Sequence, residues 1–159
     1  MSKYNVLIAR LHKELAKIQT AVQAAVSQAD KARKTDDVDY LLAAALSVQN
    51  FYMGVEQAFE EIAKQIDESL PVGASSHREL LEQMALNIPD IRPAVIQPDT
   101  LARLNDYRGF RHVVIHRYGF ELYPDRIREL VDQLPTCNDV LIRDMQSFCE
   151  FLTHLSQSL

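Results

Sequence analysis

The sequence predicts an all-α protein, an antiparallel bundle of about five helices. Three observations support this fold class. Apolar residues recur every three to four positions through most of the 159 residues, as on one face of an α-helix. The chain has only four glycines, which suits a helical protein with few tight turns. No segment shows a strand pattern that competes with the helical one.

The first two predicted helices are long. The apolar stripe of the first comprises Leu7, Leu11, Leu15, Ile18, Val22 and Ala25. The segment KTDDVD at 34–39 interrupts this stripe, and we expect Asp36 or Asp37 to cap the second helix. The second stripe extends from Leu41 to Ile66, about 30 residues of helix, and Pro71 and Gly73 are expected to end it.

Three further helices are expected in the rest of the chain. Ser76-His77-Arg78-Glu79 has the pattern of a capping box, which predicts a short helix that ends at about Leu86. Residues 87–99 (NIPDIRPAVIQPD) contain three prolines and must be irregular or extended. A fourth helix begins at Pro98 and is predicted to stop near Gly119. A fifth begins at Pro124, and Pro135 should kink or split it.

Length and composition limit the protein class. A chain of 159 residues supports one domain, which we place at 1–159, and is short for two. No apolar run approaches the length of a membrane span, and the N-terminus lacks the features of a secretory signal. Cys137 and Cys149 lie too far apart on one predicted helix to form a disulfide, so we expect reduced thiols and a cytoplasmic protein.

Positive charge is concentrated in one part of an acidic chain. The formal net charge is −5, which argues against a protein that coats nucleic acid. Between Arg103 and Arg128 there are six arginines and three acids, a local charge of +3, which leaves −8 for the rest. This distribution favours a small anionic ligand, such as one phosphodiester, over a DNA duplex.

Residues 107–122, YRGFRHVVIHRYGFEL, combine arginines and histidines with apolar residues. On a helix, Arg108, His112 and His116 share a face, whereas Arg111 and His116 lie about 140° apart and converge only if the helix ends there. Histidine can act as general acid or base, and arginine can bind a phosphate and stabilise its transition-state charge. Such a pair would allow an RNA 2′-hydroxyl to attack its own phosphate without a metal. The alternative is a solvated cationic face.

Residues 111–118, RHVVIHRY, resemble the Arg-x4-His-x-Tyr motif of HEPN ribonuclease toxins of the HepT type. The surrounding FRHVVIHRYGFEL, the upstream IRPAVI and the segment NFYMGVEQAFEEIA are also similar to that family, from about residue 35 onward. The resemblance implies a HEPN fold that dimerises and places two copies of the motif in a cleft at the interface. It implies that Arg111 and His116 are catalytic without a metal or cofactor, and that His112 supports them.

The same resemblance implies partners. HepT toxins are neutralised by an antitoxin of the MntA type, a minimal nucleotidyltransferase that can transfer AMP to the motif tyrosine, which is Tyr118 here. A phosphate-bearing group at this position would block the cleft and occupy the arginine. We expect Arg108 and Arg117 to contact RNA backbone or partner surface.

Other interpretations of these residues remain. His112 and His116 have a metal-compatible spacing, but no cysteine is nearby, the only close acids are Asp106 and Glu121, and the Glu of an H-E-x-x-H motif is missing. Tyr118 alone could be an ordinary tyrosine at the edge of the core. Phe51 and Tyr52, on the second apolar stripe, are expected to pack in the core. Asp106 is interpreted as a solvated helix charge, and Glu56 could bond an active-site arginine. As a second function, the chain could be an inactive nucleotide-binding or adaptor subunit of a nucleotidyltransferase.

Overall fold

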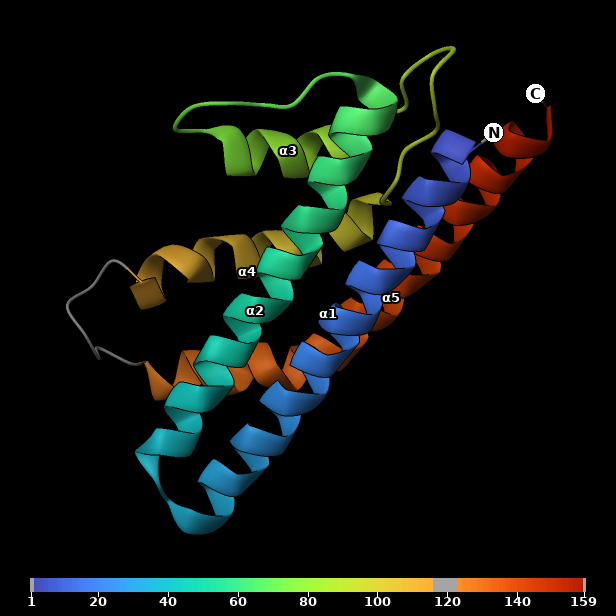
Figure 1. The fold of residues 1–159 in the computed structure, drawn as a ribbon. Helices are drawn as coiled ribbons and strands as arrows, with labels where there is room; N and C mark the ends of the chain where they lie inside the picture. The colour runs from blue at the N-terminus through green and yellow to red at the C-terminus, as the bar shows by residue number, and fades with distance from the viewer. Residues whose placement is uncertain (1, 116–122, 159) are drawn as a thin grey trace.

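A computed structural model describes the backbone of residues 2–115 and 123–158, and the side chains of 3–110 and 123–158 (Figure 1). This part of the chain is helical and confirms the predicted class, with no strand beyond one isolated bridge between Ile88 and Arg92. None of the helices described is long and apolar enough to cross a membrane. The elements are α1 (Ser2–Thr35), α2 (Val38–Ile62), the π-helix η1 (Ala63–Asp67), α3 (Ser76–Met84), α4 (Pro98–Ile115) and α5 (Pro124–Ser158).

Helices α1 and α2 form a long antiparallel hairpin, and the second half of α5 runs beside α1 (Figure 1). The turn between α1 and α2 is the predicted break, and Asp37 caps α2 by accepting a hydrogen bond from the backbone N–H of Asp39 at 2.9 Å. The two helices approach closely at Gly54, where a Cβ atom would lie 2.8 Å from Cγ1 of Ile18. Any larger residue at this position would force the helices or Ile18 to move.

The end of the second helical segment differs from the prediction. Its length of 30 residues is as expected, 25 in α2 and 5 in η1, but it ends at Asp67, with Glu68 as its C-cap, and not at Pro71 or Gly73. Glu68 adopts the left-handed conformation, with φ of 54°, and its N–H bonds back to the carbonyl of Ala63. The last turn widens to a π-helix, which the apolar pattern does not reveal.

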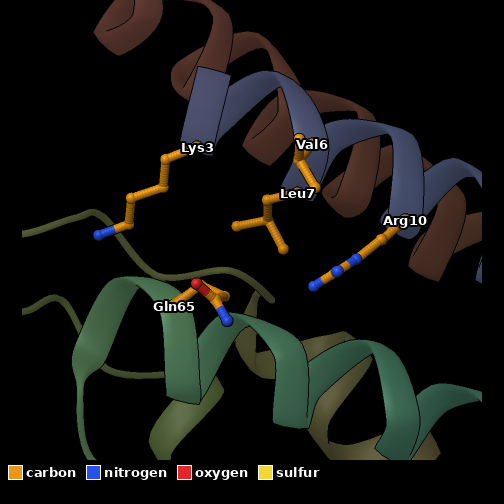
Figure 2. Close-up of a pocket in the computed structure, with 5 residues that line it drawn as sticks. All are labelled: Lys3, Val6, Leu7, Arg10 and Gln65. Carbon is orange, nitrogen blue, oxygen red and sulfur yellow. The ribbon is translucent and has the colours of Figure 1, made fainter. Parts of the chain in front are cut away.

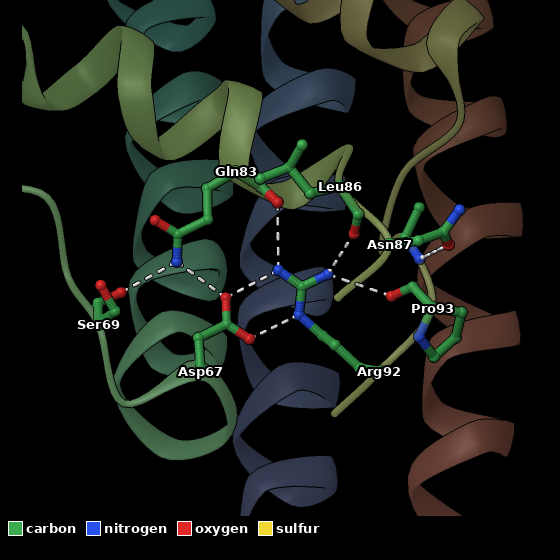
Figure 3. Close-up of polar contacts among 8 residues, drawn as sticks. Asp67, Ser69, Gln83, Leu86, Asn87, Arg92 and Pro93 are labelled. Carbon is green, nitrogen blue, oxygen red and sulfur yellow. Dashed lines mark hydrogen bonds and ion pairs between the residues drawn. The ribbon is translucent and has the colours of Figure 1, made fainter. Parts of the chain in front are cut away.

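A buried arginine holds this end of the bundle together (Figure 3). Arg92 donates from Nε and Nη2 to the two carboxylate oxygens of Asp67, at 2.6 and 2.7 Å. Its remaining N–H groups donate to the carbonyls of Leu86, Pro93 and Gln83 at 2.9 to 3.1 Å. All five donors of the guanidinium are therefore used, and the irregular segment 87–97 is fixed against η1 and α3.

The end and the N-cap of helix α3 differ from those expected from the sequence. It ends at Met84, two residues before the expected Leu86, and its N-cap is Ser75, without a side-chain capping bond. The predicted capping box at Ser76 is therefore wrong. Instead, Nδ1 of His77 lies 2.6 Å from the carboxylate of Glu56 on α2. The first turn of α3 is therefore held by a side-chain contact with α2, in place of a side-chain cap on its own backbone.

Helix α5 continues through Pro135, which bends it without splitting it. In Figure 1 its first part crosses α2 below α4, and its last part turns to follow α1. Proline lacks the N–H for the bond to the carbonyl of Val131 and clashes with that turn, which explains the bend. Cys137 and Cys149 lie on this helix as free, buried thiols. Helices α3 and α4 pack on α2 and run across it, so the bundle is not antiparallel throughout (Figure 1).

Candidate active site

The predicted catalytic segment begins on α4. The backbone of Arg111 and His112 lies in the last turns of this helix, which is described as far as Ile115. The side chains of both residues lie outside the described part, as do His116, Arg117, Tyr118 and Gly119 entirely. The described residues therefore define the support of the site: how α4 is held, and which charges surround it.

The start of α4 is fixed by a carboxylate from α5. Asp144 is buried, and one of its oxygens accepts hydrogen bonds from the backbone N–H of Gln97 at 3.0 Å and from Oγ1 of Thr100 at 2.6 Å. Its other oxygen lies 3.3 Å from the guanidinium of Arg143. An anion at a helix N-terminus satisfies unpaired N–H groups and interacts favourably with the helix dipole. Asp144 thus sets the position at which α4 begins.

Tyr107 provides the second anchor, one turn before Arg111. Its ring is buried and packs edge-on against Phe51 of α2, with centroids 5.5 Å apart. Its hydroxyl donates to the backbone carbonyl of Leu130 on α5 at 2.7 Å. Burial raises the pKa of this phenol well above its usual range, so it remains a donor at every physiological pH. Helix α4 is therefore held to both α2 and α5 immediately before the motif.

The opposite side of α4 faces solvent. Gly109 is exposed, and a Cβ there would meet nothing within 4 Å. Arg108 is half-buried and donates a hydrogen bond from Nε to Oδ1 of Asn105 at 3.0 Å. Asp106 is exposed, which agrees with its interpretation as a solvated charge. Arg108 thus lies at a surface that a polyanion could reach, in keeping with its predicted role.

The local positive charge is partly offset by neighbouring acids. Arg103 pairs with Asp99 at 3.2 Å, Arg126 with Glu129 at 3.2 Å, and Arg128 with Asp125 at 3.6 Å. Two of these acids, Asp99 and Glu129, lie outside residues 103–128, the interval over which the local charge of +3 was counted. Three of the six arginines in this interval therefore have an acidic partner among the residues that the structure describes.

The described residues contain no group of three or more His, Cys, Asp or Glu that could hold a metal ion. The pair His112 and His116, which has a metal-compatible spacing, lies outside that description. Cys137 is close to the α4 anchor, but burial raises the pKa of its thiol to about 12. A thiol that stays protonated is neither a nucleophile nor a metal ligand.

Glu56 and the aromatic pair of α2 have separate roles. Phe51 and Tyr52 are buried in the core, which confirms their interpretation as packing residues. Glu56 is also buried, and its carboxylate contacts His77. The hypothesis that Glu56 bonds an active-site arginine stays a prediction, because the side chains of Arg111 and Arg117 lie outside the described residues.

Asp144, Thr100 and Tyr107 were not predicted from the sequence as supports of the candidate site. One signal was present: Asp144 interrupts the apolar stripe of the fifth helix, between Leu141 and Met145. A charged residue in such a stripe indicates a buried partner. The identity of that partner depends on the tertiary structure, because Gln97 lies 47 positions before Asp144 in the sequence.

Comparison with known proteins gives one finding. The family described as HepT-like protein has a sequence model that matches residues 43–152, from α2 into the last turns of α5. The match includes the whole Arg111–Tyr118 motif and leaves out α1. No curated protein and no solved structure matches the chain.

Proposed function

Because the chain belongs to the HepT-like family, we propose that it is the toxin of a toxin–antitoxin pair and that it cleaves RNA without a metal ion. The observation that carries this proposal is the intact Arg-x4-His-x-Tyr sequence at 111–118, inside the range that matches the family. The two anchors of α4 support it, because a catalytic arginine needs a rigid helix beneath it.

The proposed reaction is an internal transesterification. The 2′-oxygen of a ribose attacks the adjacent phosphorus, and the bond from phosphorus to the 5′-oxygen of the next nucleotide breaks. A histidine accepts the proton of the 2′-hydroxyl, and the departing 5′-oxygen takes up a proton. Arg111 would stabilise the extra negative charge on the phosphorus, and His116 would handle the protons. The products are a 2′,3′-cyclic phosphate and a 5′-hydroxyl.

The active form that we propose is a cytoplasmic homodimer of one HEPN domain, 1–159. Two copies of the motif would share one cleft, with His112 as a supporting residue and with Arg108 and Arg117 on the RNA backbone. Few phosphates would be contacted, so binding should weaken steeply with salt.

The proposed control is covalent modification by the antitoxin, a minimal nucleotidyltransferase. The phenol oxygen of Tyr118 would attack the α-phosphorus of ATP held by the antitoxin, which releases pyrophosphate and leaves AMP on the toxin. The added phosphate would lie beside Arg111 and His116, where it competes with RNA for the same charge.

The experiment that tests this proposal is RNA cleavage by the purified protein, compared with Arg111→Ala and His116→Ala. Arg78→Ala is the matched control, because Arg78 is an exposed arginine on α3 whose ion pair with Glu82 is long, at 3.9 Å. We expect both motif variants to lose at least a hundredfold in cleavage rate and the control to keep full activity.

A protein with unmodified Tyr118 that cleaves no RNA would refute the nuclease. In that case the adaptor function, in which the cleft only binds a nucleotide or docks the nucleotidyltransferase, is the better account. Mass spectrometry must therefore accompany the assay, since an AMP adduct on Tyr118 would also abolish cleavage.

A further inference from the structure

A pocket of about 360 Å³ lies between the first turns of α1 and the π-helix η1, lined by Lys3, Val6, Leu7, Arg10 and Gln65 (Figure 2). It is separate from the candidate active site, because the end of α4 that carries Arg111 is on the other side of the bundle in Figure 1. Four of its five lining residues lie on α1, outside the range that matches the family.

The pocket joins an apolar floor to polar walls. Leu7 is buried at its base, and Val6 is 48% exposed beside it. Lys3 and Arg10 extend from α1 toward η1 on either side of Leu7, and the amide of Gln65 faces them from η1 (Figure 2). Gln65 holds this position because it lies within the π-turn, a distortion that recurs at functional sites in proteins.

The charges at the pocket favour an anion. No carboxylate is among its lining residues, and among the described residues Lys3 has no ion-pair partner within 4 Å. Arg10 is 56% exposed and has a long contact of 3.4 Å with Glu61, which lies beside the pocket. An exposed ion pair of this length is weak, so a stronger anion can draw the guanidinium away from it. The chain as a whole carries −5, which makes this cationic pocket distinctive.

We propose that this pocket binds a phosphate monoester carried on an apolar or aromatic body, a ligand the size of a nucleotide. Lys3, Arg10 and the amide of Gln65 would donate to the phosphate, and Val6 and Leu7 would contact the base or its equivalent. Arginine and lysine give the strongest charge-assisted bonds to phosphate, and the volume is within the usual range of ligand sites. The inference goes beyond the proposed nuclease and does not depend on it.

The test is calorimetric titration of the full-length protein with AMP, adenosine and inorganic phosphate. We expect AMP to bind at least tenfold more tightly than either of the others, because only AMP uses both the cations and the apolar floor. Lys3→Gln and Arg10→Gln should each weaken AMP binding at least tenfold. Lys31→Gln is the matched control, since Lys31 is an exposed lysine near the other end of α1 and the charge change is the same.

Three results would overturn the proposal. AMP could bind no more tightly than phosphate or adenosine, or not at all. Lys31→Gln could weaken binding as much as Lys3→Gln, which would indicate a general effect of charge. Arg111→Ala could abolish AMP binding, which would assign the ligand to the motif on α4. Unfolding curves of each variant by circular dichroism identify any loss that is due to misfolding, and Gln65→Leu, which removes the amide without a charge change, then repeats the test.

Discussion

The buried ion pair of Asp67 and Arg92 predicts a large and specific loss of stability. The side chains are 2% and 0% exposed, and the arginine makes five hydrogen bonds that join η1, α3 and the segment 87–97 (Figure 3). Arg92→Met keeps an apolar stem of similar length and removes all five. Among the residues that the structure describes, Asp67 would then retain only its hydrogen bond from Nε2 of Gln83, at 2.8 Å, and would remain a buried, largely uncompensated carboxylate.

The expected cost follows from that burial. Removal of one partner from a buried, hydrogen-bonded ion pair costs about 3–5 kcal/mol. A domain of this kind has a free energy of unfolding of about 5–15 kcal/mol, so the variant would lose a large fraction of it. Since 1 kcal/mol corresponds to about 2–4 °C at this chain length, Tm should fall by roughly 6–20 °C.

The assay is urea unfolding followed by circular dichroism, with Arg78→Met as the control. Arg78 and its partner Glu82 are 57% and 61% exposed, so the same substitution there should cost at most about 0.5 kcal/mol. The double variant Asp67→Leu with Arg92→Met should recover part of the loss, because it leaves no unpaired charge. A loss below about 1 kcal/mol for Arg92→Met, or a double variant less stable than the single one, would refute the reasoning.

Four further predictions concern α4 and the buried thiols. Tyr107→Phe removes only the bond to Leu130; it should cost about 1 kcal/mol in urea unfolding and lower kcat for RNA cleavage more than it changes KM. Asp144→Ala leaves the start of α4 without its carboxylate and should cost about 1–3 kcal/mol, with the largest increase in amide hydrogen exchange at residues 97–101. Cys137 and Cys149 should resist alkylation at pH 8 until the protein unfolds, because burial raises the pKa of both thiols. The pKa of Cys137 is about 12 in the folded protein, so its contribution to stability is complete below the ordinary thiol pKa and is lost as pH rises toward 12; Cys137→Ala should flatten that decline.

Local sequence was sufficient to predict most of the helices. The stripe from Leu7 to Ala25, the break at 34–39 and the capping aspartate before Val38 all depend on residues within a few positions of one another, and the structure confirms them. Pro98 and Pro124 likewise mark the first residues of α4 and α5. Proline is well suited to the first turn of a helix and needs no distant partner there.

The errors arise where a distant residue decides the local structure. The second helical segment ends before Pro71 because Asp67 is held by Arg92, 25 positions later, and the chain reverses at Glu68. The expected capping box at Ser76 is not formed, and the next residue, His77, contacts Glu56, which lies 21 positions earlier in the sequence. No local pattern contains these pairings.

In the candidate site, too, some residues can be predicted from local sequence and others depend on distant contacts. The residues that we propose to be catalytic, Arg111 and His116, belong to a short motif that can be read directly from the sequence. Its supports, Asp144 from α5 and the carbonyl of Leu130, meet α4 only in the folded protein. Phe51 could be assigned to the core from its stripe, but its edge-on contact with Tyr107 could not.

The central claim, a metal-free RNA transesterification at Arg111 and His116, is tested most directly by the ends of the cleavage products. The measurement is digestion of a defined RNA in the presence of excess EDTA, followed by mass spectrometry of both product ends. The account predicts undiminished cleavage that yields a 2′,3′-cyclic phosphate and a 5′-hydroxyl. Cleavage that stops in EDTA, or that leaves a 3′-hydroxyl and a 5′-phosphate, would contradict it, because water activated by a metal would then be the nucleophile.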